Sequence, residues 1–375
     1  MMRDIRLQKL AHLIINYSLN IKKGEYLQIR GSVVTEPLLK ELYREALKVG
    51  AYPEITTYLE GVGEILLKEG NDEQLNFVSP VSRTFAEKYD ATIHLLGGVN
   101  TKELAGVDPQ RIVARRRAMK EIIDIQQKRE AKGEYRWCLT QFPTHSDAQE
   151  GNMSLDEYAD FVFKAGLIDK EDPTAEWKKI SEQQEKVVKY LDQKKEIHII
   201  SKDTDLKMRT EGRKWINCDG KVNFPDGEVF TGPVEDSVEG YIRFSFPGIY
   251  AGKEIEDIRL TFEKGKVVKA EAAKGEELLL AILDTDQGSR TLGEIAIGTN
   301  YGIQQFTRNM LFDEKIGGTV HAAVGSAYPS TNAKNESSIH WDMLCDMRDG
   351  GKIYADGELF YENGEFLFDV IEKGI

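Results

Sequence analysis

Apolar and polar residues follow two different periods along the chain, and the change falls near residue 200. Before that point, segments with apolar residues three or four positions apart alternate with short runs of β-branched and aromatic residues. The first pattern indicates amphipathic helices and the second indicates strands. The alternation predicts an α/β domain over residues 1–200, with a mostly parallel sheet covered by helices.

The expected helices and strands of this domain have clear sequence signals. Thr35 is expected to be the N-cap of a second helix, with Pro37 in its first turn, where a missing N–H costs nothing. A long helix is expected over residues 109–130. The first helix is expected to bury five residues on one face: Leu7, Leu10, Ala11, Ile14 and Ile15. Strands are expected over residues 25–30, 55–59, 91–96, 135–140 and 196–200.

The second part of the chain has the two-residue period of strands. Residues 240–246, 258–272 and 352–368 alternate apolar with polar positions. Turns of the types Lys-Gly, Asp-Gly and Asn-Gly interrupt these runs, as they do in antiparallel hairpins. One helix is expected within residues 275–286. The pattern predicts a β-rich α+β domain over residues 201–375.

The composition excludes several classes of protein. Hydrophobic residues make up 41% of the chain and charged residues 30%, which suits a folded protein. The formal net charge of -13 would repel a phosphate backbone, so we expect no nucleic-acid partner. Because no run approaches about 18 uncharged apolar residues, we expect no membrane partner. The three cysteines form no CxxC pair, which suits a reducing cytoplasm.

A His-x-Asp pair is the first candidate for chemistry. His340 and Asp342 lie two positions apart in the β-forming segment SSIHWDML, so in a strand both side chains leave one face while Trp341 leaves the other. An imidazole and a carboxylate would then converge. Such a pair is common in proteins, and it becomes informative when further ligands lie nearby.

Further candidates lie upstream, each beside a turn or a glycine. Three are acids, one is an imidazole and one is a phenol: Glu228, Glu294, Glu314, His321 and Tyr328. Acids beside turns are usually solvated surface groups, so none of these positions indicates a site by itself.

Six long segments, however, resemble one family in its own order, over nearly the whole chain. They are residues 10–31, 154–169, 217–240, 292–300, 311–325 and 337–344, and the chain resembles the M29 family of thermophilic-type metallo-aminopeptidases. The resemblance implies a homodimer that acts on peptides with a free N-terminus, with Tyr328 in a catalytic role. It also implies two divalent metal ions bound by six residues: Glu228, Glu294, Glu314, His321, His340 and Asp342.

Charge and ligand number agree with two ions. Four carboxylates carry four negative charges, which two divalent ions would neutralise while neutral imidazoles complete the shells. One zinc ion needs three protein ligands, so six ligands suit two ions, and the ions could be zinc, cobalt, manganese or magnesium. The expected reaction is the removal of N-terminal residues by a water that the ions activate.

Two other functions remain compatible with such a site. The first is a two-metal hydrolase that cleaves another amide or an ester, because the ligands do not name the bond. The second is a non-catalytic binding protein that the ions merely stabilise. The group that handles the proton of the amine also stays open, with Glu314 and Glu235 as candidates.

Overall fold

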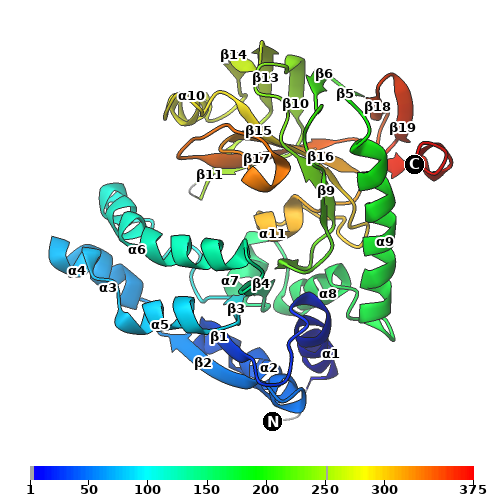
Figure 1. Cartoon of the computed structure of the whole chain (residues 1–375). Coiled ribbons are helices and arrows are strands. Elements are labelled where there is room, and N and C mark those ends of the chain that lie inside the picture. Colours follow the sequence, from blue (N-terminus) through cyan, green and yellow to red (C-terminus); the bar gives the residue numbers. More distant parts are fainter. Residues whose placement is uncertain (1–3, 251) are drawn as a thin grey trace. The chain divides into compact units, whose positions relative to one another are not determined.

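The computed structural model describes residues 4–250 and 252–375 (Figure 1). Its contacts divide the chain into two compact units. The first contains the described residues up to Thr174 together with Gly220–Pro225, and the second contains Ala175–Asp219 and Asp226–Ile375. The division into residues 1–200 and 201–375 stays a prediction.

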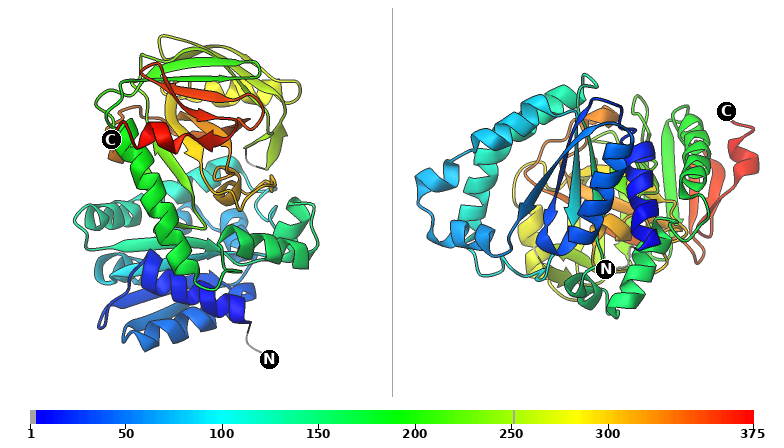
Figure 2. Two further views of the ribbon diagram at one scale, coloured as in Figure 1. Left: turned by 90° about the vertical axis from the view of Figure 1, so that its right-hand side faces the viewer. Right: turned by 90° about the horizontal axis from the view of Figure 1, so that it is seen from below.

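The first unit is built on a parallel sheet with the strand order β2-β1-β3-β4-β8. All four strand pairings are parallel, which confirms the predicted sheet. The right-hand view of Figure 2 shows α1 and α2 on one side of these strands and α6 on the other. The strands are β1 (Tyr26–Ser32), β2 (Tyr52–Tyr58), β3 (Ala91–Leu96), β4 (Arg136–Gln141) and β8 (Asn223–Phe224).

The helices of this unit follow the apolar periods of the sequence. The five apolar residues predicted for the first helical face are all buried. They lie in α1 and in the π-helical turn Ile14–Ser18 that continues it. The helices are α1 (Ile5–Leu13), α2 (Glu36–Lys48), α3 (Val62–Glu69), α4 (Asp72–Asn76), α5 (Pro80–Lys88), α6 (Pro109–Glu130), α7 (His145–Glu150) and α8 (Leu155–Ala165).

Thr35 is the N-cap of α2, as predicted, but its side chain does not cap the helix. Its Oγ1 donates a hydrogen bond to the carbonyl oxygen of Ser32 at 2.7 Å. The 3-10 turn Val33–Thr35 immediately precedes the helix, so this hydroxyl closes that turn and is directed away from the amides of α2. The sequence therefore predicted where the helix starts, but it did not predict which hydrogen bond the Thr35 hydroxyl makes.

The second unit contains two larger antiparallel sheets and a small hairpin. The eight-stranded sheet has the order β14-β13-β10-β6-β5-β18-β19-β20, and the five-stranded sheet has the order β17-β16-β15-β9-β7. The eight strands are β5 (Glu196–Ser201), β6 (Thr204–Arg209), β10 (Glu239–Phe244), β13 (Ile258–Glu263), β14 (Lys266–Glu271), β18 (Lys352–Ala355), β19 (Glu358–Glu362) and β20 (Glu365–Phe366).

The five-stranded sheet, the hairpin and four helices complete this unit. The strands are β7 (Ile216–Cys218), β9 (Glu228–Thr231), β15 (Leu292–Gly298), β16 (Thr319–Gly325) and β17 (His340–Asp346), with β11 (Gly248–Tyr250) and β12 (Lys253–Ile255) in the hairpin. The helices are α9 (Pro173–Leu191), α10 (Glu276–Leu283), α11 (Met310–Asp313) and α12 (Phe368–Ile371). The predicted β-rich character of the C-terminal part is confirmed.

Three of the predicted turns have the backbone geometry that tight hairpins need. Both residues of Lys264-Gly265, Asp356-Gly357 and Asn363-Gly364 have positive φ angles, between 47° and 84°. Turns of this hand match the right-handed twist of the strands that they join. The turns therefore fix the registers β13–β14, β18–β19 and β19–β20.

One predicted strand lies in a different sheet from the one expected. Residues 196–200 form β5, but β5 pairs antiparallel with β6 and β18 instead of joining the parallel sheet. Ser201 pairs with Thr204, so only Lys202 and Asp203 connect β5 to β6. Strands joined by two residues can pair only in the antiparallel sense. The turn contains no glycine, which is why its sequence signal is weak.

The core of the second unit lies between its two larger sheets. Buried residues from both sheets form one apolar cluster, among them Leu260 of the eight-stranded sheet and Val320 of the five-stranded sheet. Trp341 and Met343 of β17 belong to this cluster. The neighbouring residues His340 and Asp342 therefore face away from the core, as their alternation predicted.

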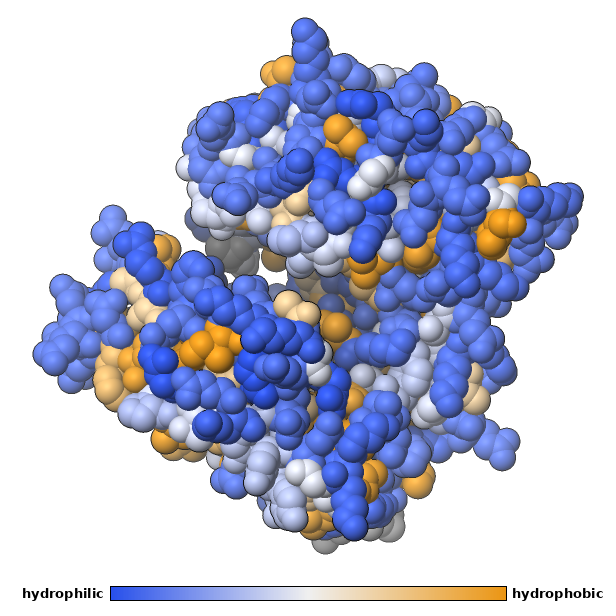
Figure 3. Space-filling model, in the orientation of Figure 1, coloured by the Kyte–Doolittle hydropathy of each residue, from blue (hydrophilic) through white to orange (hydrophobic). Residues whose placement is uncertain are grey.

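The surface is mainly polar. On the face shown in Figure 3, hydrophilic side chains cover most of the area, and apolar ones form small groups. Within the described part of the chain, no helix is both long and apolar enough to cross a membrane.

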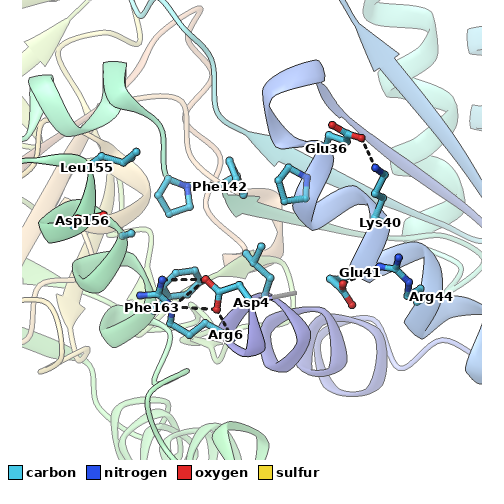
Figure 4. A pocket seen from close by; sticks show the side chains of 14 residues that line it. Asp4, Arg6, Glu36, Lys40, Glu41, Arg44, Phe142, Leu155, Asp156 and Phe163 are labelled. Atoms are coloured by element: carbon cyan, nitrogen blue, oxygen red, sulfur yellow. Dashed lines mark hydrogen bonds and ion pairs between the residues drawn. The ribbon is translucent and has the colours of Figure 1, made fainter. Parts of the chain in front are cut away.

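The first unit contains a pocket of about 570 Å³ between α1, α2 and α8 (Figure 4). Its apolar lining includes Leu7, Phe142 and Phe163. The charged groups at its rim form three ion pairs: Asp4 with Arg6, Glu36 with Lys40, and Glu41 with Arg44. Within each pair, the negative and the positive charge neutralise each other.

Candidate metal centre

Strands β15, β16 and β17 of the five-stranded sheet carry four of the predicted ligands on one face. Glu294 of β15 lies opposite Ala323 of β16, which in turn lies opposite Asp342 of β17. His321 precedes Ala323 by two residues and His340 precedes Asp342 by two. Because side chains alternate between the faces of a strand, all four functional side chains leave the same face.

The other two predicted ligands come from the edge of this arrangement. Glu228 begins β9 opposite Gly298, on the same face as Glu294. Glu314 is the C-cap residue of α11. The structure thus brings all six predicted ligands together in three groups, within which the ligand atoms lie no more than 4.8 Å apart: Glu228, Glu294 and His321; Glu294, His340 and Asp342; Glu314, His321 and Asp342.

Glu294 lies between the two histidines. His321 Nε2 is 3.5 Å from Glu294 Oε1 and 3.2 Å from Glu228 Oε2. His340 Nε2 is 3.4 Å from both Glu294 Oε2 and Asp342 Oδ2. Each oxygen of the Glu294 carboxylate therefore faces a different histidine, which is the position of a ligand shared by two cations.

The ring of His340 is oriented by the backbone. Its Nδ1 lies 2.7 Å from the carbonyl oxygen of Ser326, so Nδ1–H donates this bond and Nε2 is directed at the acids. A histidine that binds a metal through one nitrogen usually donates the other N–H to such an acceptor. On the opposite face of the strand, Trp341 Nε1 donates to the carbonyl oxygen of Ile249 at 3.0 Å, which anchors β17.

Small residues leave room above the sheet. Ala296 and Ala323 share the face of the ligands and add one methyl group each. Gly227, which precedes Glu228, has a φ angle of 124°, and a Cβ atom there would approach the Cβ of Asn300 to 2.7 Å. A side chain at position 227 would thus displace Glu228 from its place at the start of β9.

Two charged residues of the cluster, Lys315 and Asp226, were not predicted from the sequence. The Lys315 side chain is 1% exposed, and its Nζ lies 2.9 Å from Glu228 Oε1 and 3.7 Å from Asp226 Oδ1. It also contacts the carboxylate of Glu314. In the sequence, a lysine next to a glutamate is typical of a solvated surface pair, so no local signal marked it.

The close packing of charges changes the pKa of the acids and histidines. Burial raises the pKa of Glu228, and it raises the pKa of Glu314 to about 7. Burial acts to lower the pKa of His321 and His340, but hydrogen bonds to Glu294 and Asp342 and the surrounding negative charge outweigh it. The pKa rises to about 9 for His321 and to about 11 for His340. In the metal-free chain, both imidazoles are therefore protonated at pH 7.

The side chains present fit divalent metal ions. Among the described residues, Asp342 Oδ1 is a buried oxygen that accepts no hydrogen bond, and Glu228 Oε2 is a buried oxygen that faces His321 Nε2 at 3.2 Å without a hydrogen bond. A buried charged oxygen without a hydrogen bond or a bound cation costs free energy. Carboxylate oxygens and imidazole nitrogens are the donors that zinc, cobalt and manganese accept together. The cluster is therefore a candidate metal centre.

Tyr328 lies at the open side of the cluster. Its ring centroid is 5.0 Å from that of His340, with the planes 68° apart, and 5.5 Å from that of Phe230. The residue is 47% exposed, so its hydroxyl group can meet a bound molecule. Partial burial and the nearby carboxylates raise its pKa, which keeps the phenol protonated and able to donate a hydrogen bond.

Two other polar residues have structural explanations. Glu235 forms an ion pair with Arg213 at 2.6 Å and accepts a hydrogen bond from the Lys334 amide at 2.6 Å, so its carboxylate is fully engaged. Gln184 of α9 was not predicted. Its Nε2 donates to the carbonyl oxygens of Cys218 and Glu228 at 3.0 and 2.9 Å, which joins β7 to β9 beside the cluster.

The pKa values predict that metal uptake releases protons. Since His321 and His340 hold protons at pH 7 with pKa values of about 9 and about 11, both protons must leave before the imidazoles bind metal. We expect the two histidines to release about two protons when they become ligands, and Glu314, whose pKa is about 7, to release a further fraction of a proton at pH 7. The apparent affinity should rise as the pH rises. Calorimetry with cobalt in buffers of different ionisation enthalpy measures this number.

The His340→Ala variant is the control for this measurement, and its release should fall by about one proton. A heat of binding that is the same in every buffer would contradict the prediction.

Comparison with known proteins identifies the family of the chain. The family model described as thermophilic metalloprotease (M29) matches residues 3–366. Aminopeptidase T of Thermus thermophilus is 30% identical, with 94% of this chain and 95% of the relative covered. Aminopeptidase 2 of Geobacillus stearothermophilus is 28% identical, with 90% and 87% covered. The solved structure of wild-type AmpT from Thermus thermophilus matches with a TM-score of 0.83 at 25% identity, over 96% of this chain and 99% of that one. The resemblance found in the sequence is confirmed, and the chain belongs to the thermophilic metalloprotease family M29.

Proposed function

We propose that the chain is an aminopeptidase that removes N-terminal residues from peptides with the help of two divalent ions. The position of Glu294 carries this proposal, because its two carboxylate oxygens face His321 and His340 separately. The relatives named above are aminopeptidases, which supports the same bond and the same end of the peptide. Six residues are proposed as ligands for zinc, cobalt, manganese or magnesium: Glu228, Glu294, Glu314, His321, His340 and Asp342.

The proposed ligands form two metal-binding positions. Glu294 belongs to two of the three groups, with His340 and Asp342 in one and with Glu228 and His321 in the other, while Glu314 contacts both positions through the group that it forms with His321 and Asp342. When bound, two such ions make a water nucleophilic near neutral pH and polarise the scissile carbonyl group. The protein holds the ligands in place through the sheet, so little rearrangement is needed when substrate arrives.

The names of the relatives support selection of a free N-terminus, since an aminopeptidase acts at that end of a peptide. We therefore propose peptides with a free N-terminus as substrates.

Tyr328 is proposed as a catalytic residue. Its protonated phenol lies beside His340 and reaches solvent, so it can donate a hydrogen bond to the negative charge that develops on the carbonyl oxygen. A single donor of this kind contributes about 3 kcal/mol to stabilisation of the transition state.

We also propose that the enzyme works as a homodimer in the cytoplasm. Dimerisation is implied by the family that the chain resembles. The three cysteines, Cys138, Cys218 and Cys345, form no disulfide bond in the described part of the chain, which suits a reducing compartment.

Removal of one histidine tests the site. The His340→Ala variant should lose nearly all metal-dependent release of p-nitroaniline from aminoacyl-p-nitroanilides, because one ligand of the group with Glu294 and Asp342 is gone. The matched control is His198→Ala, since His198 also pairs with an aspartate, Asp205, at 2.8 Å, but on the eight-stranded sheet. Assays with added cobalt, zinc or manganese give the comparison.

The same assays separate the alternative functions. Equal cleavage of free and N-acetylated peptides would indicate a hydrolase of another kind. No metal-dependent cleavage of any substrate would indicate a protein that binds metal without catalysis. Either result rules out the proposed aminopeptidase.

Replacement of Tyr328 by phenylalanine should reduce kcat about 100-fold with little change in KM, because the hydroxyl acts mainly in the transition state. Metal content should stay unchanged. Tyr354→Phe is the control, since Tyr354 lies 5.9 Å from the ring of His198 in a similar pair remote from the cluster. An unchanged kcat in Tyr328→Phe would exclude this role.

Sedimentation of the active enzyme should give twice the 42.5 kDa mass of one chain. Activity that sediments at the mass of a single chain would contradict the proposed dimer.

A further inference from the structure

A second group of ligand-type side chains lies next to the proposed metal centre. Cys218, Asp226 and Glu228 each offer one atom, and these atoms lie within 4.8 Å of one another. Cys218 of β7 is paired directly with Glu228 of β9, so the two side chains share a face of the sheet. A thiolate with two carboxylates is a suitable donor set for zinc or cobalt. This inner group would therefore compete for the same ions as the proposed centre.

The ammonium group of Lys315 lies in this inner group. Its Nζ is 2.9 Å from Glu228 Oε1 and 3.7 Å from Asp226 Oδ1, and the side chain is 1% exposed. Burial of a single ammonium is costly, but several carboxylates around it repay the cost. The backbone holds the residue in place, because the Asn300 amide donates to the Lys315 carbonyl oxygen at 3.0 Å.

Charge accounting explains why a lysine is useful here. The full cluster contains four buried carboxylates and one partly buried one, which is one charge more than two divalent ions neutralise: Asp226, Glu228, Glu294 and Asp342 are buried, and Glu314 is partly buried. Lys315 supplies the remaining positive charge. A third divalent ion in the inner group would lie within a few ångströms of this ammonium and would be strongly repelled.

We propose that Lys315 is a positioning residue that limits the centre to two metal ions by occupying the group formed by Cys218, Asp226 and Glu228. Its ammonium also holds the carboxylates of Glu228 and Glu314 in the directions that the proposed centre requires. The inference deepens the proposed function and rests on it for the number of ions. The site of the third ion can be identified whether or not the proposed function holds, because an ion in that site would bind the sulfur of Cys218.

The test uses cobalt, because a cobalt ion bound to a thiolate has a charge-transfer absorption that carboxylate and imidazole ligands do not give. The metal-free full chain is titrated with cobalt, and the bound ions are counted. The parent protein should bind two ions without this absorption. Lys315→Met keeps a side chain of similar length without the charge, and it should bind a third ion and show the absorption.

Three further variants complete the design. Lys315→Arg keeps the charge but changes the size of the side chain, and it should behave like the parent. If the size of the side chain mattered and its charge did not, this variant would differ from the parent. Lys315→Met combined with Cys218→Ser should lose the absorption. Cys218→Ser alone should leave the number of bound cobalt ions unchanged, and this nearly isosteric change keeps the proposal testable if Lys315→Met fails to fold.

Several outcomes would overturn the proposal. They are thiolate absorption in the parent, a folded Lys315→Met variant without a third ion, and fewer bound ions in Cys218→Ser alone. Failure of the proposed function gives a different result, namely a parent that binds one ion or none or that releases no amino acid. In that case, thiolate absorption in Lys315→Met would still show that cobalt binds in the inner group when the ammonium is absent.

Discussion

Several buried carboxylates share one small space above the five-stranded sheet, and their mutual repulsion is the constraint on which the second unit depends. Each buried charge costs several kcal/mol unless an opposite charge lies close by. In the metal-free chain, Lys315 and two protonated histidines provide that charge. With ions bound, the same imidazoles must be neutral. The proposed centre would therefore exchange protons for metal, while Lys315 would keep its charge in both states.

The sheet resists this repulsion because it is held from both sides. Every residue of β15 and β16 is buried, and the face opposite the ligands packs in the apolar core between the two larger sheets. Gln184 adds a lateral connection, since it binds the backbone of β7 and β9 together at the edge. Moving the acids apart would therefore require disruption of the core as well as of the hydrogen bonds between strands.

Much of the fold follows from local signals, and less of the centre does. The alternation of apolar residues and the X-Gly turns predicted the hairpins, and the His-x-Asp spacing placed His340 and Asp342 on one face. Glu294 and Glu228 carry no such signal, so their assignment came from the resemblance to a family. Lys315 and Gln184 were missed because packing between segments that are distant in the sequence, and not local sequence, decides that they are buried. The placement of β5 failed for a related reason, since a two-residue turn without glycine decides its partner.

The ligands on β15 and β17 are separated by Ala323, so the geometry of the sheet sets the distance between them. Adjacent strands in any sheet lie about 4.8 Å apart, and evolution cannot adjust that spacing by small steps. The segment that follows β16 is under no such restriction, and it contains Tyr328 beside the cluster. Sequence differences among related enzymes should therefore be few in the strands and frequent in that segment. Insertions there can alter which peptides enter without changing the distance between the ligands.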